Sequence, residues 1–284
     1  MSTIVLLGVT GLGLAALYFL VASGLSLVFG LADVLNFAHG LFLSVGAYAT
    51  WLAADHLPIE LAIAVGVAVG ALSAVLVELV MIRPLYTRTI EQVLVTVGLS
   101  MAGVALLQAV FGADPRPFPR PRWAGGVVDV FGAIIPVDRF VLIGSAIAVF
   151  AGLMAFLRWT RYGLIVRAGV ENREMVTALG IDVRKAFTLV FAIGGAAAAL
   201  AGALAGIHFT TVSPATGGSL LIFAFIVVVI GGMGSVPGSA LAAVAVGLLQ
   251  QFVNYYGTAG AGDICVVALL AIVLLVRPKG LAAT

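Results

Sequence analysis

Polar side chains are rare in this chain, and those that could do chemistry gather in one short segment. Asp33, Asn36 and His39 lie between Gly30 and Gly40, within an otherwise apolar stretch. In hydrocarbon, irregular backbone is tolerated only where it is buried in protein or lines a water-filled cavity. The segment is therefore either a solvated loop between two helices or a broken helix whose Asn36 and His39 line a transport pathway or its gate.

A second interrupted segment, residues 231–238, reads Gly-Gly-Met-Gly-Ser-Val-Pro-Gly. Apolar segments that glycine or proline interrupts at matching places in two halves are the best pointer from sequence to a transport site. This segment is either an ordinary cytoplasmic turn or a tightly packed functional turn, and we favour the second. The candidate residues of the pathway or gate are Asn36, Phe37, His39, Gly40, Gly231, Gly232 and Gly234.

The remaining polar groups form no catalytic set. Glu78, near the end of an apolar run, is predicted to reach towards the membrane boundary. The single cysteine, Cys265, excludes a cysteine-rich metal site within one chain. Neither Lys185 nor Lys279 follows a glycine, so the chain lacks the phosphate-binding loop of an ATPase. We predict that the chain is not an enzyme, holds no metal or cofactor of its own, and takes energy from a partner or an ion gradient.

The composition defines the solvent for most of the molecule. Of 284 residues, 63% are hydrophobic and 9% are charged, and the mean hydropathy is +1.24. Soluble proteins carry about 25% charged residues, so too few charges remain here to cover a water-facing surface. The net charge of +2 argues against a nucleic-acid partner. The composition predicts a multi-pass membrane protein surrounded by lipid.

The apolar segments predict an all-α polytopic fold. A transmembrane helix needs about 20 apolar residues. Apolar segments occur at 1–32, 34–54, 61–82, 92–111, 140–157, three times between 186 and 262, and at 264–276. We expect one transmembrane domain over residues 1–284 with about 8–9 transmembrane helices, including broken or re-entrant segments. Residues 40–54 are short, and full crossing and re-entry are both open.

Basic residues predict the orientation. Residues 83–91, residues 158–185 and the tail from Arg277 hold ten of the fourteen Lys and Arg residues. Cytoplasmic loops are enriched in these residues, so these regions and the C-terminus are predicted to lie on the cytoplasmic side of the inner or plasma membrane. The loop 114–139 then faces outward. Nine crossings place the N-terminus outside, whereas a re-entrant second segment places it inside.

Glycines predict one closely packed helix. Gly194, Gly195, Gly202 and Gly206 surround an alanine-rich run at 196–201. A face of small residues lets two helix backbones approach closely. We expect this helix to pack within the subunit.

The region 158–185 is predicted to carry a short amphipathic helix. Val170, Glu171 and Glu174 suit its first turns, and Gly180 is a typical stop. Such a helix either lies on the membrane surface or docks into a groove on a soluble partner.

The motifs in these segments resemble those of LivH-type permease subunits of branched-chain amino-acid ABC importers. The resemblance covers nearly the whole chain in order. It rests on Asn-Phe-Ala-His-Gly at 36–40, Arg-Pro-Leu at 83–85, Gly163, Arg167-Ala168, Gly180-Ile181 and the glycine run at 231–238. Family members often carry an acidic residue directly after the first motif. This chain has Leu41 there, a departure that bears on the identity of the substrate.

The resemblance implies a permease that works with separate motor subunits. It would pair with a homologous permease of the LivM type, bind two ABC ATPase subunits that hold ATP and Mg²⁺, and receive substrate from a periplasmic or lipid-tethered solute-binding protein. The cytoplasmic coupling loop would lie within 158–185. The residues that couple to the ATPases would be Arg167, Ala168, Glu171, Gly180 and Ile181.

Two mechanisms of transport follow. In the first, alternating access driven by the partner ATPases moves a branched-chain or other small amino acid inward, as the resemblance implies. In the second, the chain is an ion-coupled secondary transporter of a small polar solute. That mechanism usually needs buried carboxylates within the spans, for which Asp33 and Glu78 are the candidates.

Overall fold

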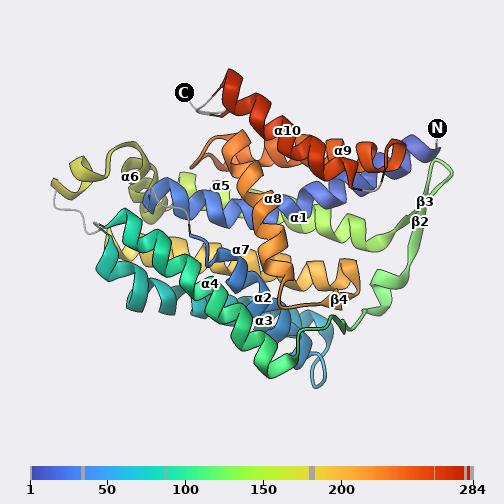
Figure 1. Cartoon of the computed structure of the whole chain (residues 1–284), viewed down its shortest axis with the longest axis horizontal. Helices are drawn as coiled ribbons and strands as arrows, with labels where there is room; N and C mark the ends of the chain where they lie inside the picture. The colour runs from blue at the N-terminus through green and yellow to red at the C-terminus, as the bar shows by residue number, and fades with distance from the viewer. Residues whose placement is uncertain are drawn as a thin grey trace.

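The computed structural model describes residues 2–32, 36–86, 88–178, 183–258, 260–277 and 280–281. Helices make up most of this part of the chain (Figure 1). The α-helices are α1 (Ser2–Ala32), α2 (His39–Ala53), α3 (Ile59–Val77), α4 (Thr89–Phe111), α5 (Val137–Trp159), α6 (Arg161–Ala178), α7 (Arg184–Phe209), α8 (Thr216–Gly231), α9 (Val236–Tyr256) and α10 (Ala261–Val276). The short elements are the π-helical turn η1 (Glu78–Ile82), the 3₁₀ turns η2 (Arg83–Leu85) and η3 (Arg122–Gly125), and the strands β1 (Arg116–Pro117), β2 (Val127–Val130), β3 (Ala133–Pro136) and β4 (Thr211–Val212).

The predicted all-α polytopic fold is confirmed. Within the described residues, six helices are long and apolar enough to cross a membrane: α1, α3 with its continuation to Leu85, α4, α5, α7 and α9. The helices α8 and α10 are apolar but shorter. Each of the predicted apolar segments contains one helix, and α6 is the additional, polar one. The chain is a multi-pass membrane protein.

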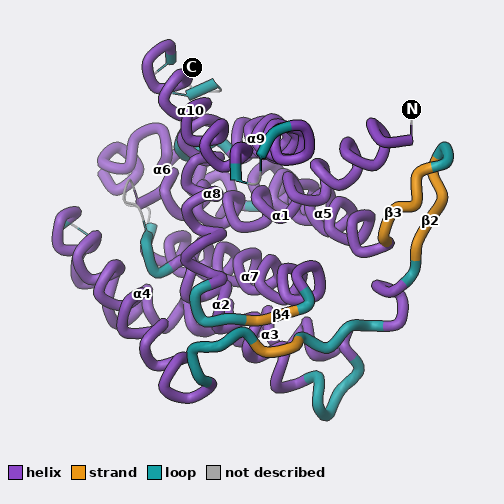
Figure 2. The backbone as a smooth tube through the Cα atoms, turned by 45° about the vertical axis from the view of Figure 1, so that its right-hand side comes forward, coloured by secondary structure: helices purple, strands orange, loops and turns teal. Residues whose placement is uncertain are grey.

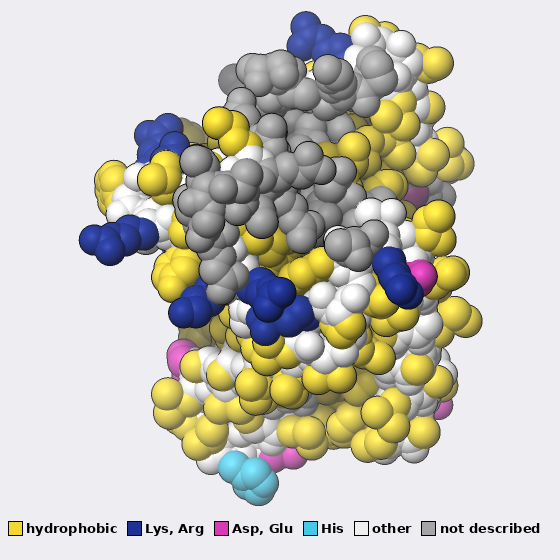
Figure 3. Space-filling view, turned by 90° about the vertical axis from the view of Figure 1, so that its left-hand side faces the viewer, with side chains coloured by type: hydrophobic (Ala, Val, Ile, Leu, Met, Phe, Trp, Pro, Cys, Tyr) yellow, Lys and Arg dark blue, Asp and Glu magenta, His cyan; other side chains and the backbone are white. Residues whose placement is uncertain are grey.

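The bundle has two chemically different ends. At one, which we call the hairpin end, β2 and β3 form an antiparallel hairpin and β1 pairs with β4 (Figure 2). At the other, which we call the basic end, lie α6, the start of α7 and the turn between α8 and α9 (Figure 1). Figure 3 shows Lys and Arg side chains gathered on this face. The distribution follows the clusters of basic residues in the sequence.

The direction of α1 places the chain's start relative to the loop 114–139. Near its beginning, Gly13 lies against Arg139 in the first turn of α5, at the hairpin end. Near its finish, Gly30 lies against Gly234 at the basic end. The start of α1 and the loop 114–139 therefore share one end of the bundle, as expected for a second segment that crosses.

Two helices are shorter than a full span and begin inside the bundle, and we call them half-helices. With 15 residues, α2 is about 22 Å long, against roughly 30 Å of hydrocarbon. It starts at His39 beside Val21 and Gly24 in α1, well before α1 ends at Ala32. The helix α8 starts beside Gly40 in α2. The second segment of the chain therefore combines non-helical backbone with a half-helix, as predicted for a broken segment.

Two three-helix units run through the bundle in opposite directions. The order of a long, a short and a long helix in α1, α2 and α3 is repeated in α7, α8 and α9. Their contacts are reciprocal: α1 packs against α9 as α7 packs against α3, and the two short helices contact each other. This is the arrangement of an inverted repeat, in which the transport site lies at the interface between the repeats.

Glycines let the central helices touch backbone to backbone. A methyl group added at Gly24 of α1 would lie 2.6 Å from the carbonyl oxygen of Gly194 in α7. One added at Gly195 would lie 2.7 Å from the carbonyl oxygen of Gly70 in α3. No side chain fits between α7 and either neighbour at these positions. The prediction that the glycine-rich helix packs within the subunit is confirmed.

Replacing Gly195 with leucine should therefore separate α7 from α3. We expect Gly195→Leu to lower the free energy of unfolding by about 3 kcal/mol or more, because overpacking here forces backbone apart. Thermal unfolding of the purified chain in detergent measures the change. Gly152→Leu in α5 is the control, since nothing lies within 4 Å of its added methyl group. Equal losses in the two variants would contradict the packing argument.

Candidate functional site

The first turns of α2 and α8 meet in the interior, and we call this contact the α2–α8 junction. Ser44 of α2 donates a hydrogen bond from Oγ to the carbonyl oxygen of Pro214 (3.2 Å) and accepts one from the amide N–H of Gly217 (3.2 Å). A methyl group added at Gly40 would lie 2.7 Å from the carbonyl oxygen of Gly217. The first N–H groups of a helix lack intrahelical partners and carry partial positive charge. The junction brings two such ends together.

His39 is the first residue of α2 and is fully buried. Its Nε2 lies 3.1 Å from the carbonyl oxygen of Val21 in α1. A carbonyl only accepts, so Nε2 carries the hydrogen and Nδ1 of the neutral ring is an acceptor. Nδ1 has no hydrogen-bond partner among the described groups. His39 thus fastens α2 to α1 and keeps one free acceptor in the interior.

Asn36 shapes the turn into α2. Its Oδ1 accepts a hydrogen bond from the amide N–H of Ala38 (3.0 Å), and its carbonyl oxygen accepts one from that of His39 (3.1 Å). Its buried Nδ2 has no partner among the described groups. Asn36 and the exposed Phe37 line a cavity of 120 Å³ beside Ile222 of α8. Asn36 and His39 are buried, so they do not lie in a solvated loop; Asp33 lies outside the described residues.

A larger polar cavity of 390 Å³ opens beside the start of α8, towards the hairpin end, and we call it the hairpin-side cavity. Thr216 and Ser219 of α8 line one side. On the other, Tyr18 of α1 donates a hydrogen bond to Gln250 Oε1 in α9 (2.6 Å), and Gln250 Nε2 donates one to Asp263 Oδ1 in α10. The cavity therefore combines an exposed carboxylate, hydroxyl groups and the positive end of a helix.

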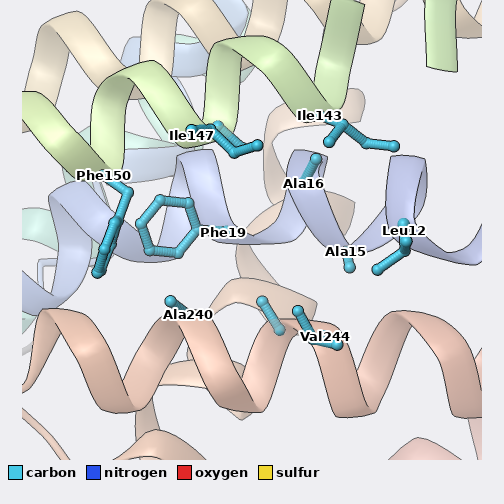
Figure 4. A pocket seen from close by; sticks show the side chains of 11 residues that line it. Leu12, Ala15, Ala16, Phe19, Ile143, Ile147, Phe150, Ala240 and Val244 are labelled. Carbon is cyan, nitrogen blue, oxygen red and sulfur yellow. The ribbon is translucent and has the colours of Figure 1, made fainter. Parts of the chain in front are cut away.

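The bundle also holds an apolar cavity of 380 Å³ between α1, α5 and α9 (Figure 4). Phe19, Ile147, Phe150, Ala240 and Val244 are among the side chains that face it. Its lining side chains carry no polar atom, so nothing there would compensate for the loss of water around a charged solute. The hairpin-side cavity is chemically the better site for such a molecule.

The second glycine run lies apart from the junction, at the basic end. Gly232 (φ 96°) and Gly234 (φ 84°) adopt the left-handed conformation that turns α8 into α9. A methyl group added at Gly231 would lie 2.5 Å from the amide nitrogen of Ser239. One added at Gly30 would lie 2.9 Å from Gly234 Cα, at the end of α1. The run is therefore a tightly packed turn, and its role in the pathway or gate stays a prediction.

The predicted pathway residues thus fall into two groups. Asn36, Phe37, His39 and Gly40 lie together near the start of α8, whereas the glycines of 231–234 lie at its end. Ser44, Gly217 and Asp263 are not among the predicted site residues. The proline at 214, followed by Gly217 and Gly218, is a signal in the sequence that suits a helix starting inside a bundle.

The helix α6 begins earlier than predicted. It starts at Arg161, so Val170, Glu171 and Glu174 lie in its second half and not in its first turns. The prediction was wrong because it missed a cap: the amide N–H of Gly163 donates a hydrogen bond to Thr160 Oγ1 (2.9 Å).

One face of α6 packs on the bundle and another is exposed. Gly169 and Val170 lie against the end of α1, and Val170 also touches the turn at Gly234. Two of the predicted coupling residues, Arg167 and Ala168, are exposed. Glu171 lies within the helix, but its side chain is outside the described part of the structure. Gly180 and Ile181 are outside the described residues.

Comparison with known proteins identifies the family. Residues 8–276 match the model of the branched-chain amino acid transport system / permease component family. The chain belongs to this family. It is 29% identical to the high-affinity branched-chain amino acid transport system permease protein LivH of Escherichia coli K12, over 95% of this chain and 92% of the relative. It is also 29% identical to the high-affinity branched-chain amino acid transport system permease protein BraD of Pseudomonas aeruginosa PAO1, over 96% of this chain and 94% of the relative.

Sugar permeases are more distant relatives. The fructose import permease protein FruF of Bifidobacterium longum is 28% identical over 94% of this chain and 76% of its own length. No solved structure matches the chain. The resemblance inferred from the motifs is confirmed, and the chain is a transport permease.

In this permease, Glu78 does not reach towards the membrane boundary as predicted, because it is fully buried. Its Oε1 accepts hydrogen bonds from Arg83 Nε (3.1 Å) and the Tyr86 hydroxyl, and its Oε2 accepts one from Thr188 Oγ1 (2.9 Å). The prediction was wrong because Arg83, one turn later, supplies a counter-charge, and α7 supplies a hydroxyl. The carboxylate is committed to an ion pair with Arg83, and its hydrogen bond with Thr188 links the end of the α3 segment to α7.

Ser44→Ala tests the α2–α8 junction. The substitution leaves the amide of Gly217 without its acceptor, so we expect a loss of about 1–3 kcal/mol in the free energy of unfolding. Ser23→Ala is the matched control, because Ser23 is equally buried but bonds only to Leu20 in its own helix. Thermal unfolding in detergent measures both. A loss in Ser23→Ala as large as that in Ser44→Ala would argue against a special role of the junction.

Proposed function

We propose that this permease carries a branched-chain or similarly small amino acid past the α2–α8 junction. The observation that supports this most directly is the meeting of two half-helix starts in the interior, beside polar atoms of Asn36 and His39 that have no partner among the described groups. Backbone N–H groups at helix starts attract carboxylates without a fixed cation. A site of this kind releases its solute readily, as transport requires.

The hairpin-side cavity matches the other parts of an amino acid. Asp263 offers a carboxylate to the ammonium group, while Thr216 and Ser219 belong to the helix start that faces the carboxylate. Leu220 and Phe223 provide an apolar wall for an aliphatic side chain. The solute would enter this cavity and then pass the junction towards the basic end.

A second permease subunit would complete the pathway. On this chain Phe37, Ser219 and Ile222, which lie along the start of the route, are exposed. A polar route that opened directly to lipid would leave its solute unsolvated. A homologous subunit, for example of the LivM type, would cover this side.

The energy for transport would come from two ABC ATPase subunits, which would dock at the basic end and bind ATP and Mg²⁺ themselves. Their push would act on the exposed face of α6, whose other face touches the end of α1 and the turn at Gly234. That turn ends α8, whose start forms the junction. A displacement of α6 would thus be transmitted along α8 to the junction.

The two ends of the bundle support an orientation. The basic end, with the C-terminal segment packed on it through Gly280 and Gly232, would face the cytoplasm, since basic residues concentrate on that side. The hairpin end would receive a periplasmic or lipid-tethered solute-binding protein. The membrane would be the inner or plasma membrane of the cell.

Uptake by the reconstituted complex tests this function. With ATPases, second permease and binding protein in proteoliposomes, we expect leucine uptake that requires ATP. Asp263→Asn should reduce the rate about tenfold, because one charge-assisted hydrogen bond contributes about 1.5–3 kcal/mol. The control is Asp55→Asn, in an exposed turn at the hairpin end. Full activity of Asp263→Asn would reject the cavity, and uptake driven by a proton or sodium gradient alone would reject the ATPase mechanism.

Cross-linking tests the coupling surface. After Cys265→Ser, the chain contains no cysteine, so a single Ala168→Cys can be joined to an ATPase subunit with a short bismaleimide. We expect a cross-linked product whose amount changes when ATP is added. Asp55→Cys, at the opposite end, should give none. No product from Ala168→Cys in an active complex would show that α6 does not meet the ATPase.

A further inference from the structure

A groove of 410 Å³ lies on the outer surface of the bundle at the basic end, between α3 and α7. Arg83, Tyr162, Lys185 and Thr188 line its polar part. We call it the Arg83–Lys185 groove. It is separate from the α2–α8 junction and from the exposed face of α6 that carries Arg167.

The polar part of the groove has a net positive charge. Arg83 forms an ion pair with Glu78, and the charges of these two residues cancel. Arg83 also donates a hydrogen bond from Nη2 to Thr188 Oγ1 (2.8 Å). Lys185 is exposed, and no carboxylate among the described residues lies within ion-pair distance of it. Among the described residues, one uncompensated ammonium group therefore remains, beside a guanidinium that is 35% exposed.

The rest of the groove is apolar and continues along the same two helices. On α7, Leu189 and Ala192 follow Lys185 by four and seven residues, which places them on the same helix face. On α3, Val75 lines the groove further from the polar part. The cationic groups thus lie at the helix ends, and the apolar lining extends from them towards the middle of the span.

We propose that the Arg83–Lys185 groove binds an anionic glycerophospholipid. Its phosphate would bind Lys185 and Arg83, with the Tyr162 hydroxyl as a further donor, and one acyl chain would lie along Leu189 and Ala192. Basic pockets between transmembrane helices recognise anionic lipid head groups in this way. A free anion would leave the apolar part unused, and the choline group of a zwitterionic lipid would oppose the uncompensated ammonium. The bound lipid braces α3 against α7 next to the start of α6.

Native mass spectrometry of the full chain in detergent, titrated with dioleoyl phosphatidylglycerol, tests the proposal. The wild-type chain is expected to bind dioleoyl phosphatidylglycerol at least fivefold more tightly than dioleoyl phosphatidylcholine. Lys185→Gln should weaken this binding about fivefold, the effect of one basic residue near an anionic lipid. Lys185→Arg should retain it. Ala192→Phe, which fills the apolar part but keeps both cations, should also weaken it.

The controls separate a specific groove from general attraction to a basic surface. Arg277→Gln removes a charge at the end of α10 without touching the groove, and it should bind like wild type. Size-exclusion profiles and unfolding temperatures of all variants establish that they are folded. Equal weakening by Arg277→Gln and Lys185→Gln, or equal affinity for the two lipids, would overturn the proposal. So would loss of ATPase recruitment in Lys185→Gln with unchanged lipid binding, because the groove would then be a docking surface for that partner.

Discussion

Backbone-to-backbone contact between helices is the constraint on which this permease depends. Lipid is as apolar as leucine, so burial of apolar side chains gives little reason for helices to associate in a membrane. Close packing has to supply that reason. At Gly24 with Gly194, and at Gly195 with Gly70, the absence of side chains lets α7 lie directly against α1 and α3. The two inverted units are joined along this line.

That close packing also makes room for two half-helices. Because α1, α3 and α7 form a tight scaffold, α2 and α8 can start inside it, where their unpaired N–H groups would be costly in lipid. Ser44 satisfies one of these groups, and His39 ties α2 back to α1 through Val21. The same arrangement leaves Asn36 Nδ2 and His39 Nδ1 unpaired among the described groups. The close packing of α1, α3 and α7 around the starts of α2 and α8 therefore both stabilises the bundle and creates its polar interior.

The basic end connects the parts that would have to move. The end of α1, the turn between α8 and α9, and Val170 of α6 lie in mutual contact at Gly30 and Gly234. At the same end, the buried Glu78 pairs with Arg83 and is linked to α7 by a hydrogen bond from Thr188. An ion-paired cluster and a glycine-rich contact thus lie at the same end of the bundle. The first is suited to hold the scaffold, and the second to transmit a displacement of α6.

The sequence by itself determined that this is a helical membrane protein, where most of its apolar segments lie, and that residues 36–40 and 231–238 interrupt them, because composition and local hydropathy carry this information. It also identified the family through its motifs. Only the tertiary structure decided that the start of α2 meets that of α8, and that Glu78 is buried. Ser44 and Gly217, and likewise Glu78 and Thr188, are more than a hundred residues apart in the chain. Contacts of this kind depend on how whole helices pack, and no local pattern of residues encodes them.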